Sequence, residues 1–143
     1  MVQVVLVDDH ALVREGLRSL LNTYQDLQVV GEAQNGAEAV RMVGRLRPHV
    51  VVMDIHMPTM NGIEATKHIK ARWPKTTVIG IAAYPSHGHR AEMKRAGAAT
   101  LLTKTIIVGK LYAAIQQSIK RRKRAQKAEV HASGSPPDVT RRS

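Results

Sequence analysis

The segment HVVVMDIHMPTMNG, residues 49–62, decides the fold class of this chain. Its residues 50–53 form an uninterrupted apolar run, which is typical of a strand covered on both faces in a parallel sheet. The run ends on a single carboxylate, Asp54, and then breaks at Pro58 and Gly62, residue types that mark loops. The segment therefore predicts a buried strand that brings one acidic side chain to the edge of a sheet.

Four other short apolar runs lie on either side of this segment, and segments of helical length separate them. The runs are QVVLV (3–7), QVVGEA (28–33), TVIGIAA (77–83) and ATLLT (99–103). Apolar residues recur at helical spacing in residues 11–21, 36–46, 62–72, 86–97 and 108–124. The first of these helices is predicted to bury Leu12, Val13, Leu17, Leu20 and Leu21 on one face. Pro74 is expected to stop the third helix and Gly97 to cap the fourth. This alternation predicts an α/β fold of the (βα)5 type, a five-stranded parallel sheet with helices on both faces.

The composition indicates one domain followed by a tail. A chain of 143 residues, of which 43% are hydrophobic, can bury one core but is too short for two ordinary domains. There is no cysteine, so disulfides and thiolate metal sites are excluded. The N-terminal residues resemble neither a signal peptide nor a membrane span, and we expect a soluble, cytoplasmic protein without membrane contact.

The net charge of +11 is concentrated near the C-terminus. Residues 120–143 carry eight of the 22 Lys and Arg residues and two of the 11 acidic ones. Such a run can neutralise nucleic-acid phosphates, but a solvated helix end that leads into a linker has the same composition. HASGSPPDVTRRS, residues 131–143, has almost nothing to bury, which favours a flexible tail from about Glu129. We therefore divide the chain into a domain at 1–124 and a flexible basic linker at 125–143.

Charged side chains follow three of the predicted strands. Asp8 and Asp9 follow the first strand, Asp54 ends the third, and Lys104 follows the fifth. Because ligands of open parallel sheets bind at the carboxyl ends of the strands, we expect these four side chains to meet at one edge. Lys104 would be two strands, about 10 Å, from Asp54 at the backbone, a gap that its long side chain can close.

Such a cluster predicts metal-dependent phosphoryl chemistry. Three neighbouring carboxylates repel one another unless a cation lies among them, and oxygen ligands without cysteine favour Mg²⁺. With Mg²⁺ screening an anionic donor, Asp54 is the candidate nucleophile toward phosphorus, and Lys104 can neutralise a product oxygen. Among the histidines, His10 is expected to open the first helix, while His87 and His89 are expected in a surface loop. We do not expect a histidine metal site.

The segments VLVDDHALVREGLRSLL, VVVMDIHMPTMNGIEAT and AGAATLLTK closely resemble the receiver domain of two-component response regulators, above all the LuxR/NarL-type subfamily. The resemblance covers residues 1–122. It implies a flavodoxin-like (CheY-like) sheet in the order 2-1-3-4-5, and a phosphoryl group transferred to Asp54 by a sensor histidine kinase. It also implies direct Mg²⁺ ligation by Asp9, Asp54 and the backbone carbonyl of His56, with Asp8 acting through water and Lys104 contacting the phosphate.

The sequence departs from this family at the positions that normally report phosphorylation. The family usually has Thr or Ser at the end of the fourth strand, where this chain has Ala82, whose methyl group cannot donate a hydrogen bond. The aromatic residue normally found early in the fifth strand is replaced by Leu101. Tyr84 is a candidate for a compensating hydroxyl, although a solvent-facing loop tyrosine is an equal alternative. An atypical switch is therefore predicted.

Two points stay open at the level of sequence. No helix-turn-helix pattern follows Arg124, so DNA binding is expected only through an output domain absent from this chain. Homodimerisation on activation is a second open point. The chain is accordingly expected to be a signalling phosphoacceptor that catalyses only its own phosphorylation and dephosphorylation. The alternatives are a stand-alone single-domain receiver and a phosphorylation-independent interaction module, which Ala82 and Leu101 favour.

Overall fold

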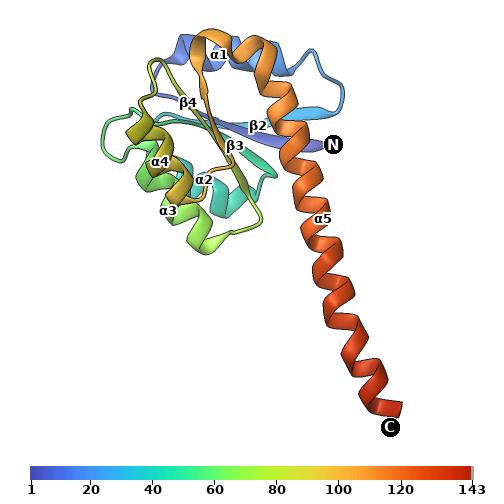
Figure 1. The fold of residues 1–143 in the computed structure, drawn as a ribbon. Helices are drawn as coiled ribbons and strands as arrows, with labels where there is room; N and C mark the ends of the chain where they lie inside the picture. The colour runs from blue at the N-terminus through green and yellow to red at the C-terminus, as the bar shows by residue number, and fades with distance from the viewer. Residues whose placement is uncertain (143) are drawn as a thin grey trace.

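Alternating strands and helices build a single parallel sheet (Figure 1). The structure is a computed structural model that describes the backbone of residues 1–142 and the side chains of residues 1–132. The strands lie in the order β2-β1-β3-β4-β5 and every neighbouring pair is parallel, as predicted. The elements are β1 (Val2–Val7), α1 (Ala11–Leu21), β2 (Leu27–Ala33), α2 (Gly36–Leu46), β3 (Val50–Asp54), α3 (Gly62–Arg72), β4 (Thr77–Ala82), α4 (His87–Ala96), β5 (Thr100–Thr103), a 3-10 turn (Lys104–Ile106) and α5 (Ile107–Arg142).

The apolar strands bury side chains on both faces of the sheet. In β1, Val4 and Leu6 pack toward α1 and α5, while Val5 and Val7 pack toward α2, α3 and α4. Successive side chains of a strand point to opposite faces, so a continuous apolar run requires helices on both sides. Figure 1 shows α1 and α5 on one side of the sheet and α2, α3 and α4 on the other. The central strands β1 and β3 thus hold the residues that follow them in fixed positions.

The predicted helix ends are also found. Helix α3 ends at Arg72, directly before Trp73 and Pro74. Helix α4 ends at Ala96 and is capped by Gly97, whose φ of +107° lies in the left-handed region that glycine adopts without strain.

Helix α4 begins at His87, close to the predicted start, so His87 and His89 belong to its first turn and not to the surface loop in which they were expected. Ser86 Oγ accepts a hydrogen bond from the His89 N–H at 3.1 Å, and His89 Nδ1 accepts one from the Ser86 N–H at 3.2 Å. This is a capping box in which histidine occupies the position usually taken by Glu or Gln. Residues 86–97 were predicted as a helix, but the cap was not recognised because histidine is not the usual partner of the N-cap serine.

The prediction that Leu12 is buried was wrong, since Leu12 is 79% exposed. The buried stripe of α1 runs through Leu17 and Leu21, with Val13 and Leu20 packed beside them. Leu12 precedes this stripe by one residue, or about 100° of helix rotation, which turns it toward solvent.

Helix α5 is longer than the sequence suggested. It continues through Arg142, where a linker was predicted from residue 125 and a flexible tail from about Glu129. Near its start α5 is tied to the loop between α1 and β2, because the Tyr112 hydroxyl donates to Asp26 Oδ2 at 2.8 Å and the Tyr112 ring stacks on Tyr24. Figure 1 shows its second half extending away from the sheet.

Candidate functional site

The carboxyl edge of the sheet brings together charged residues from three strands. Strands β1 and β3 are neighbours with Val7 opposite Met53, so Asp8 and Asp54 follow side by side. Lys104, which follows β5, reaches across β4 and places its Nζ 2.8 Å from Asp8 Oδ2 and 3.5 Å from Asp54 Oδ2. The predicted meeting of these side chains is therefore observed, including the long reach of the lysine.

Asp8 is fully buried and held by several partners. Its Oδ1 accepts a hydrogen bond from the His10 N–H at 2.9 Å, and its backbone carbonyl accepts one from Arg14. Burial opposes ionisation of Asp8, but the Lys104 ammonium and the His10 N–H outweigh it and keep the pKa of this carboxyl below its usual value. Asp8 is thus a fixed negative charge at the base of the site.

Asp54 has the opposite electrostatic character. It is 2% exposed, and this burial, together with the neighbouring Asp8 charge, raises the pKa of Asp54 to about 6, against the pull of Lys104. The burial of Lys104 lowers its pKa, but the two carboxylates outweigh burial and hold it above the usual value. One ammonium therefore compensates two buried carboxylates incompletely, and Asp54 is the carboxyl whose pKa rises as a result.

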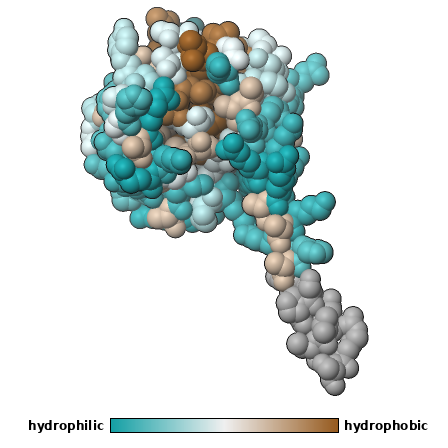
Figure 2. Space-filling model, viewed as in Figure 1, coloured by the Kyte–Doolittle hydropathy of each residue, from teal (hydrophilic) through white to brown (hydrophobic). Residues whose placement is uncertain are grey.

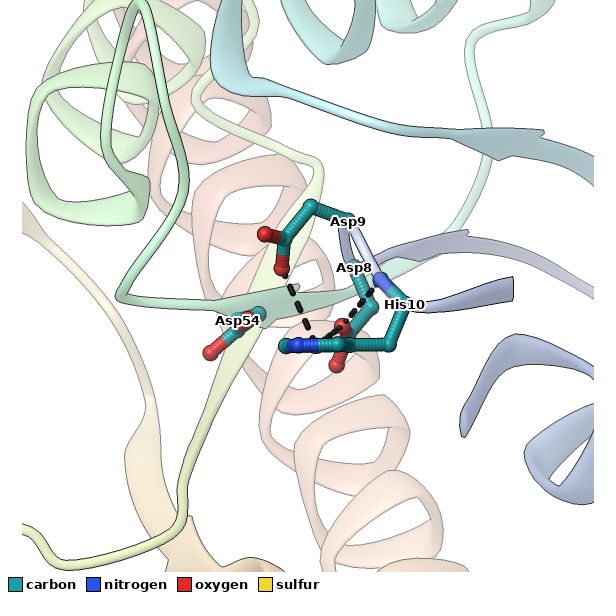
Figure 3. A group of neighbouring side chains, drawn as sticks. All are labelled: Asp8, Asp9, His10 and Asp54. Atoms are coloured by element: carbon teal, nitrogen blue, oxygen red, sulfur yellow. Dashed lines mark hydrogen bonds and ion pairs between the residues drawn. The ribbon is translucent and has the colours of Figure 1, made fainter. Parts of the chain in front are cut away.

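Asp9 and His10 complete the cluster at its outer side. Figure 3 shows Asp8, Asp9, His10 and Asp54 converging, with ligand atoms that all lie within 4.8 Å of one another. His10 opens α1 as predicted, but its side chain does not cap the helix. Its Nδ1 lies 3.0 Å from Asp8 Oδ1 and 3.1 Å from Asp9 Oδ1. Sequence reasoning missed this contact, although the position of His10 directly after the two acids was the available signal.

The loop after Asp54 is shaped around the carboxylate. The His56 N–H donates to Asp54 Oδ1 at 3.3 Å, and the His56 ring lies edge-to-face against His89 of α4, with centroids 4.9 Å apart. Gly62 must lack a side chain, because a Cβ there would lie 2.1 Å from the Asp54 carbonyl oxygen. Pro58 lies in the same loop. The close approach of the Asp54 carbonyl is therefore the steric reason for glycine at this position.

The residues at which the sequence departs from the family, Ala82, Leu101 and Tyr84, make no hydrogen bond with this cluster. Ala82 is fully buried at the end of β4, opposite Thr103 of β5. Leu101 is 5% exposed and packs in the core under α4, beside a cavity of about 270 Å³. Tyr84 is 88% exposed and has no hydrogen bond within the part of the chain whose side chains are described. Of the two alternatives for Tyr84, a compensating hydroxyl or a solvent-facing loop tyrosine, this conformation shows the second.

The cluster fits a hard divalent cation. Apart from Lys104, Asp8 Oδ2 and Asp54 Oδ2 have no hydrogen-bond partner among the described residues, although both are buried. Carboxylate oxygens that lack partners in an under-compensated site are the donors that Mg²⁺ prefers. Asp8, Asp9 and Asp54 are the side chains in position to hold such an ion.

Fold and site together define a class, the flavodoxin-like parallel α/β proteins that carry an acidic cluster and a lysine at the carboxyl edge of the sheet. More closely, the chain belongs to the response regulator receiver domain family, whose model matches residues 4–116. Receiver domains are the signalling modules of two-component response regulators, and this family typically uses Mg²⁺ and phosphorylation.

Individual relatives support this assignment. The chain is 37% identical over 120 residues to the transcriptional regulatory protein LiaR of Bacillus subtilis (strain 168), covering 84% of this chain and 57% of LiaR. A LuxR-family two-component response regulator from Aurantimonas sp. SI85-9A1 matches with a TM-score of 0.77 at 34% identity, over 80% of this chain and 82% of that one. The response regulator domain of Thermotoga maritima CheB matches with a TM-score of 0.79 at 33% identity, over 84% and 97%.

Two further facts bear on the whole protein. The chain spans about half the length of the curated relatives that it matches. Among the described residues, no helix is both long enough and apolar enough to span a membrane.

Proposed function

We propose that Asp54 accepts a phosphoryl group from a sensor histidine kinase in a Mg²⁺-dependent reaction. The observation that carries this proposal is the buried Asp54 carboxylate, which shares the Lys104 ammonium with Asp8 and has an otherwise unpartnered Oδ2. An oxygen without a hydrogen bond is free to attack, and the site around it is built to receive added positive charge.

The reaction follows from these positions. An Asp54 oxygen attacks the phosphorus of a phosphohistidine, a P–O bond forms as the P–N bond breaks, and the leaving imidazole takes a proton from solvent. Bound Mg²⁺ supplies the positive charge that offsets repulsion between the carboxylates and the phosphoryl group. Asp9, Asp54 and the His56 carbonyl are the proposed direct ligands, and Asp8 is proposed to act through water. The Lys104 ammonium pairs with a phosphoryl oxygen of the product.

The same proposal extends to the partners of the chain. Residues 1–124 act as the receiver and residues 125–143 as the connection to a DNA-binding output part, consistent with relatives that are transcriptional regulators and of which the chain covers 49% and 57%. The kinase docks on the side of α1, where Leu12 is exposed. Ile106 of the 3-10 turn and Val108 of α5 are exposed as well. Figure 2 shows an apolar patch in this part of the surface. We place the reaction in the cytoplasm. We further propose that the phosphorylated form homodimerises, and that the chain catalyses only its own phosphorylation and dephosphorylation.

Incubation with Mg²⁺ and a small acyl-phosphate donor is expected to add one phosphoryl mass to the intact chain. The Asp54→Asn variant is expected to gain none, because an amide cannot form the acyl phosphate, and omission of Mg²⁺ should prevent the gain in the wild type. Intact-protein mass spectrometry checks all three samples. Absence of a gain in the wild type, or a gain that persists in Asp54→Asn, would favour a phosphorylation-independent interaction module, the alternative that Ala82 and Leu101 support.

A further inference from the structure

A basic cavity of about 380 Å³ lies at the amino edge of the sheet, the edge opposite Asp54. The end of α3, the loops before β4 and β5, the start of β4 and the part of α5 that leaves the sheet line this amino-edge cavity. Figure 1 shows α5 passing the N-terminus before it extends away. The charged residues of the lining are Lys70, Lys75, Arg121, Arg122 and Glu129. Among the described residues, four cations therefore line the cavity with one carboxylate, an excess of three positive charges.

Arg122 is partly buried in this lining without a counter-charge. Its Nη1 is buried and has no hydrogen-bond partner among the residues whose side chains are described. None of the four cations forms an ion pair with a carboxylate in the same part of the chain. Arg122 also lines a neighbouring cavity of about 270 Å³, which no described acidic residue lines. A buried guanidinium nitrogen without an acceptor is costly, and an anion in the amino-edge cavity would remove that cost.

Lys70 is held at the wall of the amino-edge cavity by the loop before β4. Its Nζ donates to the backbone carbonyls of Pro74 and Thr76, at 2.7 and 2.8 Å. An ammonium has three N–H donors, so one is left for a ligand. Burial, and then the Arg122 charge, lower the pKa of Lys70, and both act in the same direction on the pKa of His49. The positive charge at this edge of the sheet is therefore uncompensated by the groups around it.

We propose that the amino-edge cavity binds a small phosphorylated anion with at least two negative charges, and that Arg122 and Lys70 are its main contacts. Guanidinium groups form bidentate hydrogen bonds with phosphoryl oxygens, and a lysine ammonium adds a compact positive charge. The volume is near the lower end of small-molecule sites, about 300–1,000 Å³, which suits a diphosphate group. Because α5 and the loop before β4 both line the cavity, the bound anion joins the outgoing helix to the sheet. The site does not include Asp54 and requires no phosphoryl transfer.

The test is calorimetric titration of the full chain with sodium pyrophosphate, in buffer freed of divalent ions. Arg122→Gln is expected to weaken binding by about tenfold or more, because a charge-assisted contact with a phosphoryl oxygen is lost. Glu129→Gln removes the one carboxylate of the described lining and is expected to strengthen binding by about twofold to fivefold. Opposite effects of these two variants are the signature of an anion in the cavity.

The matched control is Arg124→Gln, which removes the same charge from the same helix at an exposed position outside the lining of the cavity. It is expected to change the affinity for pyrophosphate by less than about twofold, since exposed charges interact weakly. Equal losses in Arg122→Gln and Arg124→Gln would overturn the proposal. They would show that the basic helix attracts phosphate along its length, as a surface for nucleic-acid phosphates does.

A second readout covers the case in which Arg122→Gln fails to fold. In the wild-type chain, pyrophosphate is expected to shift the amide NMR signals of residues 75–78, 97–99 and 118–126 and to leave those around Asp54 in place. Shifts confined to the neighbours of Asp54, or no shifts at millimolar pyrophosphate, would overturn the proposal. Because neither readout involves phosphorylation, failure of the amino-edge cavity as an anion site and failure of Asp54 as phosphoacceptor are separately visible.

Discussion

Replacing Asp54 with asparagine is expected to stabilise the metal-free protein at neutral pH, by about 1–2 kcal/mol. The reason is the raised pKa of Asp54, about 6 against a usual 3.8, which means that the folded protein resists ionising this carboxyl. Each unit of pKa shift corresponds to about 1.4 kcal/mol, and we reduce the full value because solvent at the edge of the sheet screens part of the repulsion. For a chain of this size the gain raises the melting temperature by about 3–6 °C.

The pH dependence of this effect has a definite sign. Between pH 3.8 and about 6 the unfolded chain has lost the Asp54 proton while the folded chain retains it. Stability therefore falls as the pH rises through this window, and the loss is complete above pH 7. Asparagine has no such proton, so the variant and the wild type should differ little below pH 4 and most above pH 7. Thermal melts of both proteins at pH 3.5, 5 and 8 in the presence of EDTA measure the difference.

Asp26 provides an opposite control. Its pKa is lowered by hydrogen bonds from Tyr112 and Gln116, so Asp26→Asn should not stabilise the chain at pH 8. Addition of Mg²⁺ should raise the melting temperature of the wild type more than that of Asp54→Asn, because the ion offsets the repulsion that the variant has already lost. If the wild type were more stable than Asp54→Asn at pH 8 without metal, the prediction would be wrong. The attraction of Lys104 for the Asp54 carboxylate would then exceed the combined cost of its burial and of repulsion by Asp8.

The sequence predicted the sheet and the clustered charges well because both follow from local pattern plus one topological rule. A buried strand such as residues 50–53 must be apolar on both faces, and the ends of parallel strands meet at one edge. The meeting of Asp8, Asp54 and Lys104 then required only the length of a lysine side chain. Gly97 was also placed correctly, because a glycine in the left-handed conformation commonly follows the last turn of a helix.

The sequence was less informative where side-chain direction matters more than position. His10 was assigned to a helix start, which is correct for its backbone, but nothing in the pattern fixes the direction of its ring. His89 acts as a capping residue in place of Glu or Gln, so its role was not visible in the sequence although the helix itself was predicted. Leu12 was misplaced by a single residue of helix phase, which apolar character alone does not resolve.

The structure adds one contact that bears on how the site communicates with α4. The His56 ring touches His89, and His56 also donates its N–H to Asp54. His89 in turn holds the N-terminal cap of α4 through Ser86. If phosphorylation of Asp54 displaces His56, we expect this contact to carry the movement to the start of α4 without the hydroxyl that Ala82 lacks.

Restoring a hydroxyl at position 82 is expected to strengthen the conformational response to phosphorylation. Phosphorylation shifts a conformational equilibrium only as far as the phosphoryl group interacts differently with the two states. A hydrogen bond to a charged group contributes about 1.5–3 kcal/mol, which corresponds to a roughly tenfold to hundredfold larger shift in population. The Ala82→Thr variant, saturated with the phosphoryl mimic beryllofluoride and Mg²⁺, should therefore show larger amide NMR shifts across residues 82–104 than the wild type.

Two variants test whether the hydroxyl at position 82 is the cause of the larger NMR response. Ala83→Thr adds the same group at the neighbouring exposed position and is expected to behave like the wild type. His89→Gln keeps the α4 cap but removes the ring contact with His56, so a smaller response in this variant would assign the remaining coupling to that contact. If the amide NMR shifts across residues 82–104 were as large in the wild type as in Ala82→Thr, the hypothesis of an atypical switch would be wrong. In that case the buried methyl of Ala82 and the core packing of Leu101 would transmit the signal without a hydroxyl or an aromatic ring.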